Sequence, residues 1–111
     1  MRTALKVLFA VIFVSMTAVT IRAGMAISLW DAWADYAANP WAVATLYDAY
    51  FGFLTFYVWV LFKERKLWAR VLWLVLIACL GNIAMSFYVL MQLHRLPADE
   101  TVEAVLWHRT A

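Results

Sequence analysis

Three long apolar runs dominate the chain, and short polar or charged stretches separate them. Residues 7–21 and 71–93 contain no charged side chain, and residues 41–62 are interrupted only by Asp48. At about 1.5 Å per helical residue, such runs can cross a hydrocarbon core of about 30 Å, provided that Arg22 snorkels at the end of the first. The pattern predicts an all-α membrane protein with three transmembrane helices. The predicted spans cover about residues 5–27, 41–62 and 71–93.

Two shorter stretches, residues 28–38 and 98–109, are predicted to form interfacial helices. The first begins with Ser28 three residues before Asp31, which is typical of a helix N-cap. The second has its acidic residues near its start and Arg109 near its end, which suits the helix dipole. Tryptophan concentrates at the depth of the lipid headgroups, so some side chains should anchor the outer surface. These predicted anchors are Trp30, Trp33 and Trp41.

Composition strengthens the membrane prediction and excludes several classes of protein. Of 111 residues, 68% are hydrophobic and 14% are charged, with a mean hydropathy of +0.80. Soluble domains have about 45–50% apolar and about 25% charged residues. A soluble enzyme domain, a nucleic-acid binder and a disulfide scaffold are therefore excluded, and we expect one integral membrane domain. A cleaved signal peptide is the alternative for the first run, because Arg2 and Lys6 precede it, but Arg22 is poorly placed for cleavage.

Lysine and arginine residues predict the orientation in the membrane. The N-terminus and the connection between the second and third runs hold six of them, and the first connection and the C-terminal tail hold three. The positive-inside rule then predicts a cytoplasmic N-terminus and an external C-terminus, in a protein of the bacterial inner membrane. In the second connection the basic side chains are expected to set topology and to meet anionic lipid headgroups. These residues are Lys63, Arg65, Lys66 and Arg70.

Asp48 is the candidate functional residue. An ionised carboxylate about 12 Å inside a span costs at least about 2.5–3.5 kcal/mol, so it needs a partner, water or a proton. Helical spacing places small and hydroxyl residues on its face, and the first and third runs offer polar groups at a similar depth. The hypothesis is a buried Arg22–Asp48 pair that is hydrogen-bonded to Asn82. The predicted intramembrane cluster comprises Arg22, Thr45, Asp48, Gly52, Thr55, Asn82 and Ser86.

Three interpretations of this cluster remain open. The cluster could fix helix register, serve as a site for a proton, an ion or a headgroup, or contact another subunit. The leading hypothesis is a non-catalytic subunit that is accessory to a larger membrane complex or forms a homo-oligomer. The alternative is a proton-coupled transporter or an intramembrane isomerase that uses Asp48 as its acid or base. No metal site and no cofactor are predicted, although the aromatic residues could stack on a lipid, quinone or pigment.

Nearly half of the chain resembles a family of small polytopic membrane proteins of bacteria and plants that is known only as a domain of unknown function. The similar pieces are Asn39-Pro40-Trp41, the stretch Thr45-Leu46-Tyr47-Asp48-Ala49-Tyr50-Phe51-Gly52-Phe53, Trp59-Val60, Lys63-Glu64, Trp73 and Leu80-Gly81-Asn82-Ile83-Ala84. The resemblance supplies no reaction. It implies that some polar and glycine positions belong to the pattern of the family. These are Asp48, Gly52, Glu64, Gly81 and Asn82.

Overall fold

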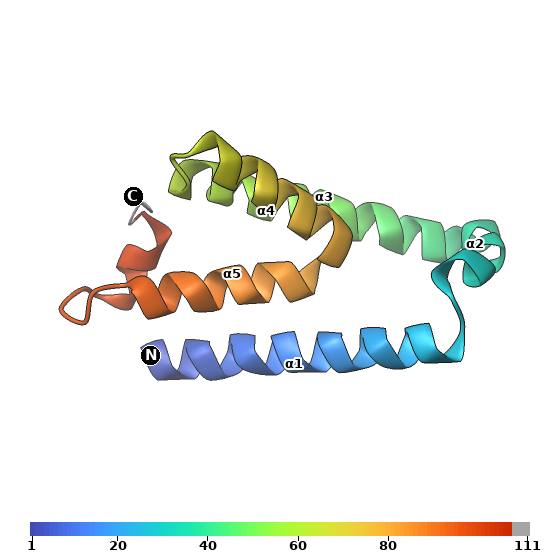
Figure 1. The fold of residues 1–111 in the computed structure, drawn as a ribbon, viewed down its shortest axis with the longest axis horizontal. Helices are drawn as coiled ribbons and strands as arrows, with labels where there is room; N and C mark the ends of the chain where they lie inside the picture. The colour runs from blue at the N-terminus through green and yellow to red at the C-terminus, as the bar shows by residue number, and fades with distance from the viewer. Residues whose placement is uncertain (108–111) are drawn as a thin grey trace.

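Two long helices run along the molecule, and a short helix joins them at one end (Figure 1). α1 (Arg2–Ala26) and α3 (Pro40–Lys63) are long and apolar enough to cross a membrane, and α2 (Leu29–Ala38) connects them. The computed structural model describes residues 1–107, and this part of the chain is all-helical. The first two predicted spans therefore coincide with single helices.

Side-chain caps determine where α2 and α3 begin. The Ser28 hydroxyl accepts a hydrogen bond from the Asp31 N–H at 3.1 Å, as the sequence predicts. The Asn39 side-chain oxygen accepts one from the Trp41 N–H at 3.0 Å, and Pro40 takes the first helical position. Proline suits this position because its fixed φ is helical and an N–H there would lack a partner. Local sequence thus accounts for the turn between α1 and α3.

The third apolar run is not one helix, and the prediction of a single span over residues 71–93 is wrong. Gly81 divides the run into α4 (Leu67–Leu80) and α5 (Asn82–Arg95), which fold back on each other (Figure 1). Gly81 has φ +56° and ψ −123°, and an added Cβ would lie 2.7 Å from Cζ of Phe53. Only glycine adopts this conformation without strain. Each arm is about 21 Å long, which is too short to cross a bilayer.

Polar side chains satisfy backbone groups at the tip of this hairpin. The Tyr50 hydroxyl on α3 donates to the Ala78 carbonyl oxygen at 2.9 Å, in the last turn of α4. The Ser86 hydroxyl donates to the Asn82 carbonyl oxygen at 2.7 Å, in the first turn of α5. The carbonyl groups in the last turn of a helix lack intrahelical partners, so the Tyr50 bond stabilises the end of α4 inside an apolar segment, whereas the Ser86 hydroxyl bonds back within its own helix.

Because α5 returns toward the start of α1, both terminal segments lie at one end of the molecule (Figure 1). The Arg2 guanidinium donates to the Leu96 carbonyl oxygen at 3.0 Å and to the Pro97 carbonyl oxygen at 2.8 Å. Within the described residues, this arrangement does not fit the expectation that the two termini lie on opposite sides of a membrane. The helix break at Gly81 reverses the direction of the chain and brings the two segments together.

The second predicted interfacial helix is reduced to one short 3-10 helix, η1 (Val102–Leu106), in the described residues. The rest of that prediction, residues 108–109, lies outside them. η1 packs at the end that carries the termini, where Ala104 and Val105 are buried with Leu93 and Leu96. It lies at the opposite end of the molecule from α2 (Figure 1).

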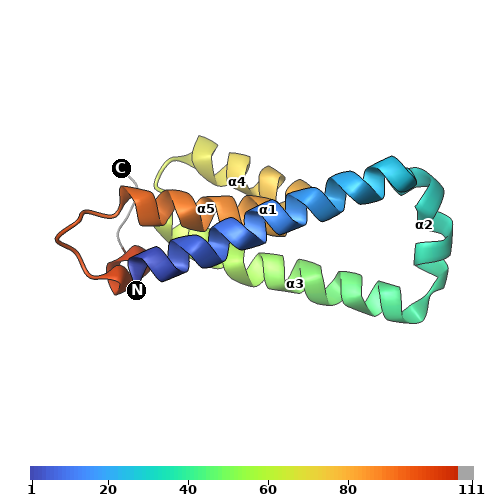
Figure 2. The same cartoon turned by 90° about the horizontal axis from the view of Figure 1, so that it is seen from below.

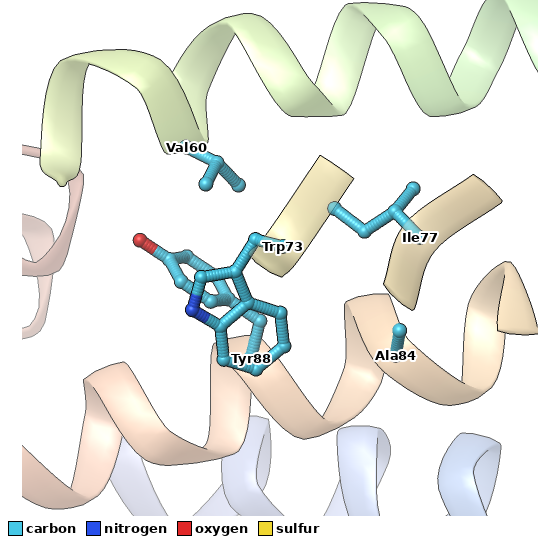
Figure 3. Packing of buried hydrophobic residues seen from close by; sticks show 5 residues of the cluster. All are labelled: Val60, Trp73, Ile77, Ala84 and Tyr88. Carbon is cyan, nitrogen blue, oxygen red and sulfur yellow. The ribbon is translucent and has the colours of Figure 1, made fainter. Parts of the chain in front are cut away.

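The main core lies where α3, α4 and α5 meet. It consists of five buried side chains, shown in Figure 3: Val60, Trp73, Ile77, Ala84 and Tyr88. The Tyr88 ring is fully buried and meets the Trp73 ring edge to face, with 4.7 Å between their centroids. Aromatic pairs favour this geometry because the positive edge of one ring faces the negative face of the other. Leu5 and Phe9 attach α1 to a second buried cluster on α5.

The other end of the molecule has no comparable core. Residues 18–26 of α1 are all exposed, and no residue of α2 is buried. Figure 2 shows α1 and α3 diverging toward α2, while α4 and α5 remain in the opposite half of the molecule. We call this half, comprising residues 18–26, α2 and residues 40–52, the open end. The half that carries the terminal segments is the packed end.

Candidate functional site

The predicted polar face of α3 is present, but no other part of the described chain covers it. Asp48, Thr45, Gly52 and Thr55 are all exposed. The two threonine hydroxyls donate to carbonyl oxygens of their own helix, each at a distance of 2.9 Å. Asp48 therefore faces away from the protein within a single chain, contrary to the expectation that it faces other helices.

The hypothesised Arg22–Asp48 pair does not form in the part of the chain that the structure describes. Arg22 is exposed in the last turns of α1, and Asn82 is exposed at the hairpin tip. Of the partners predicted for Asp48 outside α3, Ser86 alone is buried, and its hydroxyl is bonded within α5. The prediction fails because α2 separates the ends of α1 and α3, so these helices do not pack on each other there. The cluster is therefore dispersed.

The structure instead buries ionisable side chains at the packed end. Lys63 and Glu64 are 1% and 5% exposed, although they belong to a charged run that the sequence analysis treats as a surface turn. The Tyr88 hydroxyl donates to Oε2 of Glu64 at 2.8 Å. A buried carboxylate is costly unless it accepts hydrogen bonds, and Tyr88 supplies one from the centre of the core. Together these residues join the end of α3 to α5.

The C-terminal segment completes this buried cluster. Lys63 Nζ donates to the Val105 carbonyl oxygen and lies 5.6 Å from the centroid of the Trp59 ring, a cation–π distance. The Trp59 indole N–H donates to the Leu106 carbonyl oxygen at 2.9 Å. These contacts bind η1 to the end of α3.

The four basic residues predicted to meet lipid headgroups divide into two pairs. Lys63 is buried as described, and Arg70 Nε donates to the Glu64 carbonyl oxygen at 2.7 Å. The Tyr57 hydroxyl in turn donates to the Arg70 carbonyl oxygen at 2.6 Å. Arg65 and Lys66 remain exposed. Half of the predicted set is therefore bonded inside the protein: Lys63 holds η1, and Arg70 stabilises the α3–α4 connection.

The Glu64–Tyr88 contact was not predicted from the sequence, because Tyr88 lies within an uncharged run and 24 residues from its partner. One signal was available: Glu64 is the only acid between Asp48 and Asp99. The predicted anchors Trp30, Trp33 and Trp41 are all exposed at the open end. Within residues 1–107, no group of three His, Cys, Asp or Glu side chains could hold a metal ion.

Over residues 1–107 the fold is that of a small all-helical protein. Two of its helices, α1 and α3, are long and apolar enough to span a membrane, and the α4–α5 hairpin packs against both of them at one end. The chain belongs to the family described as "Protein of unknown function (DUF1475)", whose family model matches residues 3–110. The match confirms the resemblance to an uncharacterised family and extends it over almost the whole chain. Comparisons with curated proteins and with solved structures found no match.

Proposed function

We propose that the protein is an integral membrane protein in which α1 and α3 cross the bilayer and the α4–α5 hairpin enters it from one side. The apolar surface supports this: α1 has no buried residue, and side chains such as Val11, Phe51 and Val58 are more than half exposed. Monomeric soluble proteins rarely leave so large an apolar surface in water. The hydrogen bonds of Arg2 to the Leu96 and Pro97 carbonyl oxygens favour retention of α1 over its removal as a signal peptide.

The distribution of basic residues supports a cytoplasmic packed end. The packed end carries seven of the eight lysine and arginine residues in the described part of the chain, and Arg22 is at the other end. The charge asymmetry between the two ends is larger here than in a three-span arrangement. Because the third apolar run folds back, Arg95 lies at the same end as the other basic residues and not at the opposite end. By the positive-inside rule, both terminal segments are cytoplasmic and α2 lies at the outer surface. The membrane of residence in this proposal is the bacterial inner membrane.

Within the membrane, the protein acts as a self-associating, non-catalytic subunit that pairs through the Asp48 face of α3. The observation that carries this proposal is the exposure of Asp48 inside an apolar helix. A carboxylate at this depth does not face lipid without a large energetic cost, so the face requires a partner. The required cover must come from another chain, because no described residue of the same chain supplies it.

A second copy of this chain suits that face. An added Cβ at Gly52 would meet nothing within 4 Å, so another helix backbone can approach there closely. Around a two-fold axis at Gly52, the two Asp48 carboxyl groups face each other and can share one proton, as paired carboxylates do. Thr45 and Thr55 flank the pair, and their hydroxyl oxygens can accept further hydrogen bonds.

Cysteine cross-linking in native membranes tests this proposal. In a Cys79→Ser background, Gly52→Cys should form a disulfide-linked dimer under mild oxidation. Leu54→Cys is the matched control, because Leu54 is also exposed but lies about 200° around the helix. Asp48→Leu should lower the cross-linked fraction several-fold, whereas Asp48→Asn, which can still hydrogen-bond, should retain most of it.

Three outcomes would overturn self-association. Equal cross-linking of Gly52→Cys and Leu54→Cys would show that the chains do not associate through a specific face of α3. Stoichiometric co-purification of a different membrane protein, lost in Asp48→Leu, would make the chain an accessory subunit. A monomer that moves protons or substrate in an Asp48-dependent manner would establish the transporter or enzyme alternative.

A further inference from the structure

A cavity of about 350 Å³ opens beside Glu64 at the packed end. Three cationic side chains line it: Arg65 and Lys66 from the α3–α4 connection, and Arg95 from the last turn of α5. All three are exposed, and none donates a hydrogen bond to another residue in the described part of the chain. Glu64 is the acidic residue of the lining, and one of its oxygens already accepts the Tyr88 hydroxyl. The cavity therefore has an excess of positive charge.

The remaining wall of the cavity is apolar. Trp68 and Leu72 on α4 and Met91 on α5 continue from the basic rim along the hairpin. Trp68 is 65% exposed and Leu72 is 45% exposed, so this wall is open on its outer side. A ligand complementary to the site has an anionic head and an apolar tail that lies along α4.

The backbone adds further donors beside the cations. Lys66 is the N-cap of α4, and no side chain caps the first turn of this 14-residue helix. Trp68 and Ala69, whose N–H groups belong to that turn, also line the cavity. The N–H groups of a first helical turn are suited to bind phosphate oxygens.

We propose that this cavity binds the phosphate headgroup of an anionic phospholipid, with an acyl chain lying along Trp68 and Leu72. The volume is at the lower end of ligand pockets, which suits a headgroup rather than a whole lipid. The proposal rests on the membrane placement given above, in which the basic end faces the cytoplasmic leaflet. It assigns a specific lipid contact to Arg65, Lys66 and Arg95, and it excludes Lys63 and Arg70, which are bonded inside the protein.

Lipid retention measured by native mass spectrometry tests the site. The full chain in mild detergent is titrated with phosphatidylglycerol, with zwitterionic phosphatidylcholine, and with inorganic phosphate alone. Phosphatidylglycerol should be retained at one molecule per chain, and Arg95→Gln should weaken its binding roughly tenfold, which corresponds to about 1.4 kcal/mol, because it removes a charge-assisted hydrogen bond to the phosphate. The double variant Arg65→Gln/Lys66→Gln should weaken phosphatidylglycerol binding more than Arg95→Gln does. Arg95→Lys, which keeps the charge, should retain most of the wild-type affinity. Arg22→Gln removes the same charge at the open end and should change nothing.

The result that overturns the proposal is equal retention of phosphatidylglycerol by the wild-type chain and the Arg95→Gln chain. Retention of phosphatidylcholine as tight as that of phosphatidylglycerol would also overturn it. If inorganic phosphate is retained at the same concentrations as phosphatidylglycerol, the site would bind free phosphate instead of lipid. The Gly52→Cys cross-link, measured in chains that keep Arg95, separates the two proposals. A cross-linked dimer that retains no phosphatidylglycerol defeats only this inference, and phosphatidylglycerol retention that Arg95→Gln weakens, in a chain that forms no Gly52→Cys dimer, defeats only self-association.

Discussion

At the packed end, two charged residues, Lys63 and Glu64, are buried and bonded, whereas at the open end Arg22 and Asp48 are exposed on two helices that diverge. Lys63 and Glu64 come from a run of four consecutive charged residues, yet they are nearly inaccessible and bind η1 and α5. Asp48 and Arg22, which are flanked by apolar residues, have no such contacts with other described residues. The difference shows that the apolarity of neighbours in the sequence is a poor guide to burial in this chain. What decides burial is whether α4 and α5 reach the position.

The largest expected effect tests the core of the packed end. Tyr88→Ala should lower the free energy of unfolding by about 3 kcal/mol, because it removes a fully buried ring and its aromatic contacts. Tyr47→Ala at the open end should change it by less than about 0.5 kcal/mol, since that ring is 61% exposed. Both are measured by titrating the purified protein in mild detergent with SDS and following tryptophan fluorescence.

Tyr88→Phe separates the ring from its hydroxyl. It keeps the packing but leaves Oε2 of Glu64 without the Tyr88 donor, so a smaller loss of about 1–2 kcal/mol is expected. Similar losses for Tyr88→Ala and Tyr47→Ala would mean that the two ends of the molecule do not differ in packing.

An intermediate effect is expected at the hairpin tip. Gly81→Ala should cost about 2 kcal/mol, because it places a side chain at positive φ and brings its Cβ against the Phe53 ring. Gly24→Ala is the matched control at the open end, where an added Cβ meets nothing within 4 Å. This control should stabilise the protein by about 0.5–1 kcal/mol through the higher helix propensity of alanine. The same SDS titration measures both variants, and a neutral Gly81→Ala would indicate a continuous helix over residues 71–93.

The smallest effect is expected for the pair that the sequence suggested. Arg22→Gln should change the free energy of unfolding by less than about 0.5 kcal/mol, because Arg22 is exposed and is not paired with Asp48 in the described residues. The double variant Arg22→Gln/Asp48→Asn, measured in a double-mutant cycle, should show no coupling. A coupling energy above about 1 kcal/mol would restore the intramembrane ion pair and contradict the separation of α1 and α3.

Elements with local determinants were predictable. The Ser28 and Asn39 caps are visible as residue types at the correct spacing, and the structure confirms the helices that they begin. The fold-back at Gly81 was not predicted, since an apolar run has the same composition whether it is straight or folded in half. A glycine inside a helix is common, and only the approach of Phe53 and the positive φ show that this one is a turn. The candidate site shows the same difference between local and distant features. Helical spacing places Thr45, Asp48 and Gly52 along α3, but the partners expected for Asp48 on α1 and α5 do not cover it in the described residues.

The sequence by itself determined that the described part of the chain is helical and, within a few residues, where α1, α2 and α3 begin and end, because side-chain caps and the lengths of the apolar runs are local features. It also determined that the chain belongs to a family of unknown function, since a family is recognised from residue pattern alone. Only the tertiary structure decided which end is packed, that both terminal segments meet there, and that Glu64 binds Tyr88. Those features depend on the direction that α5 takes after Gly81. That direction is decided by contacts between residues far apart in the chain, for which local pattern carries no information.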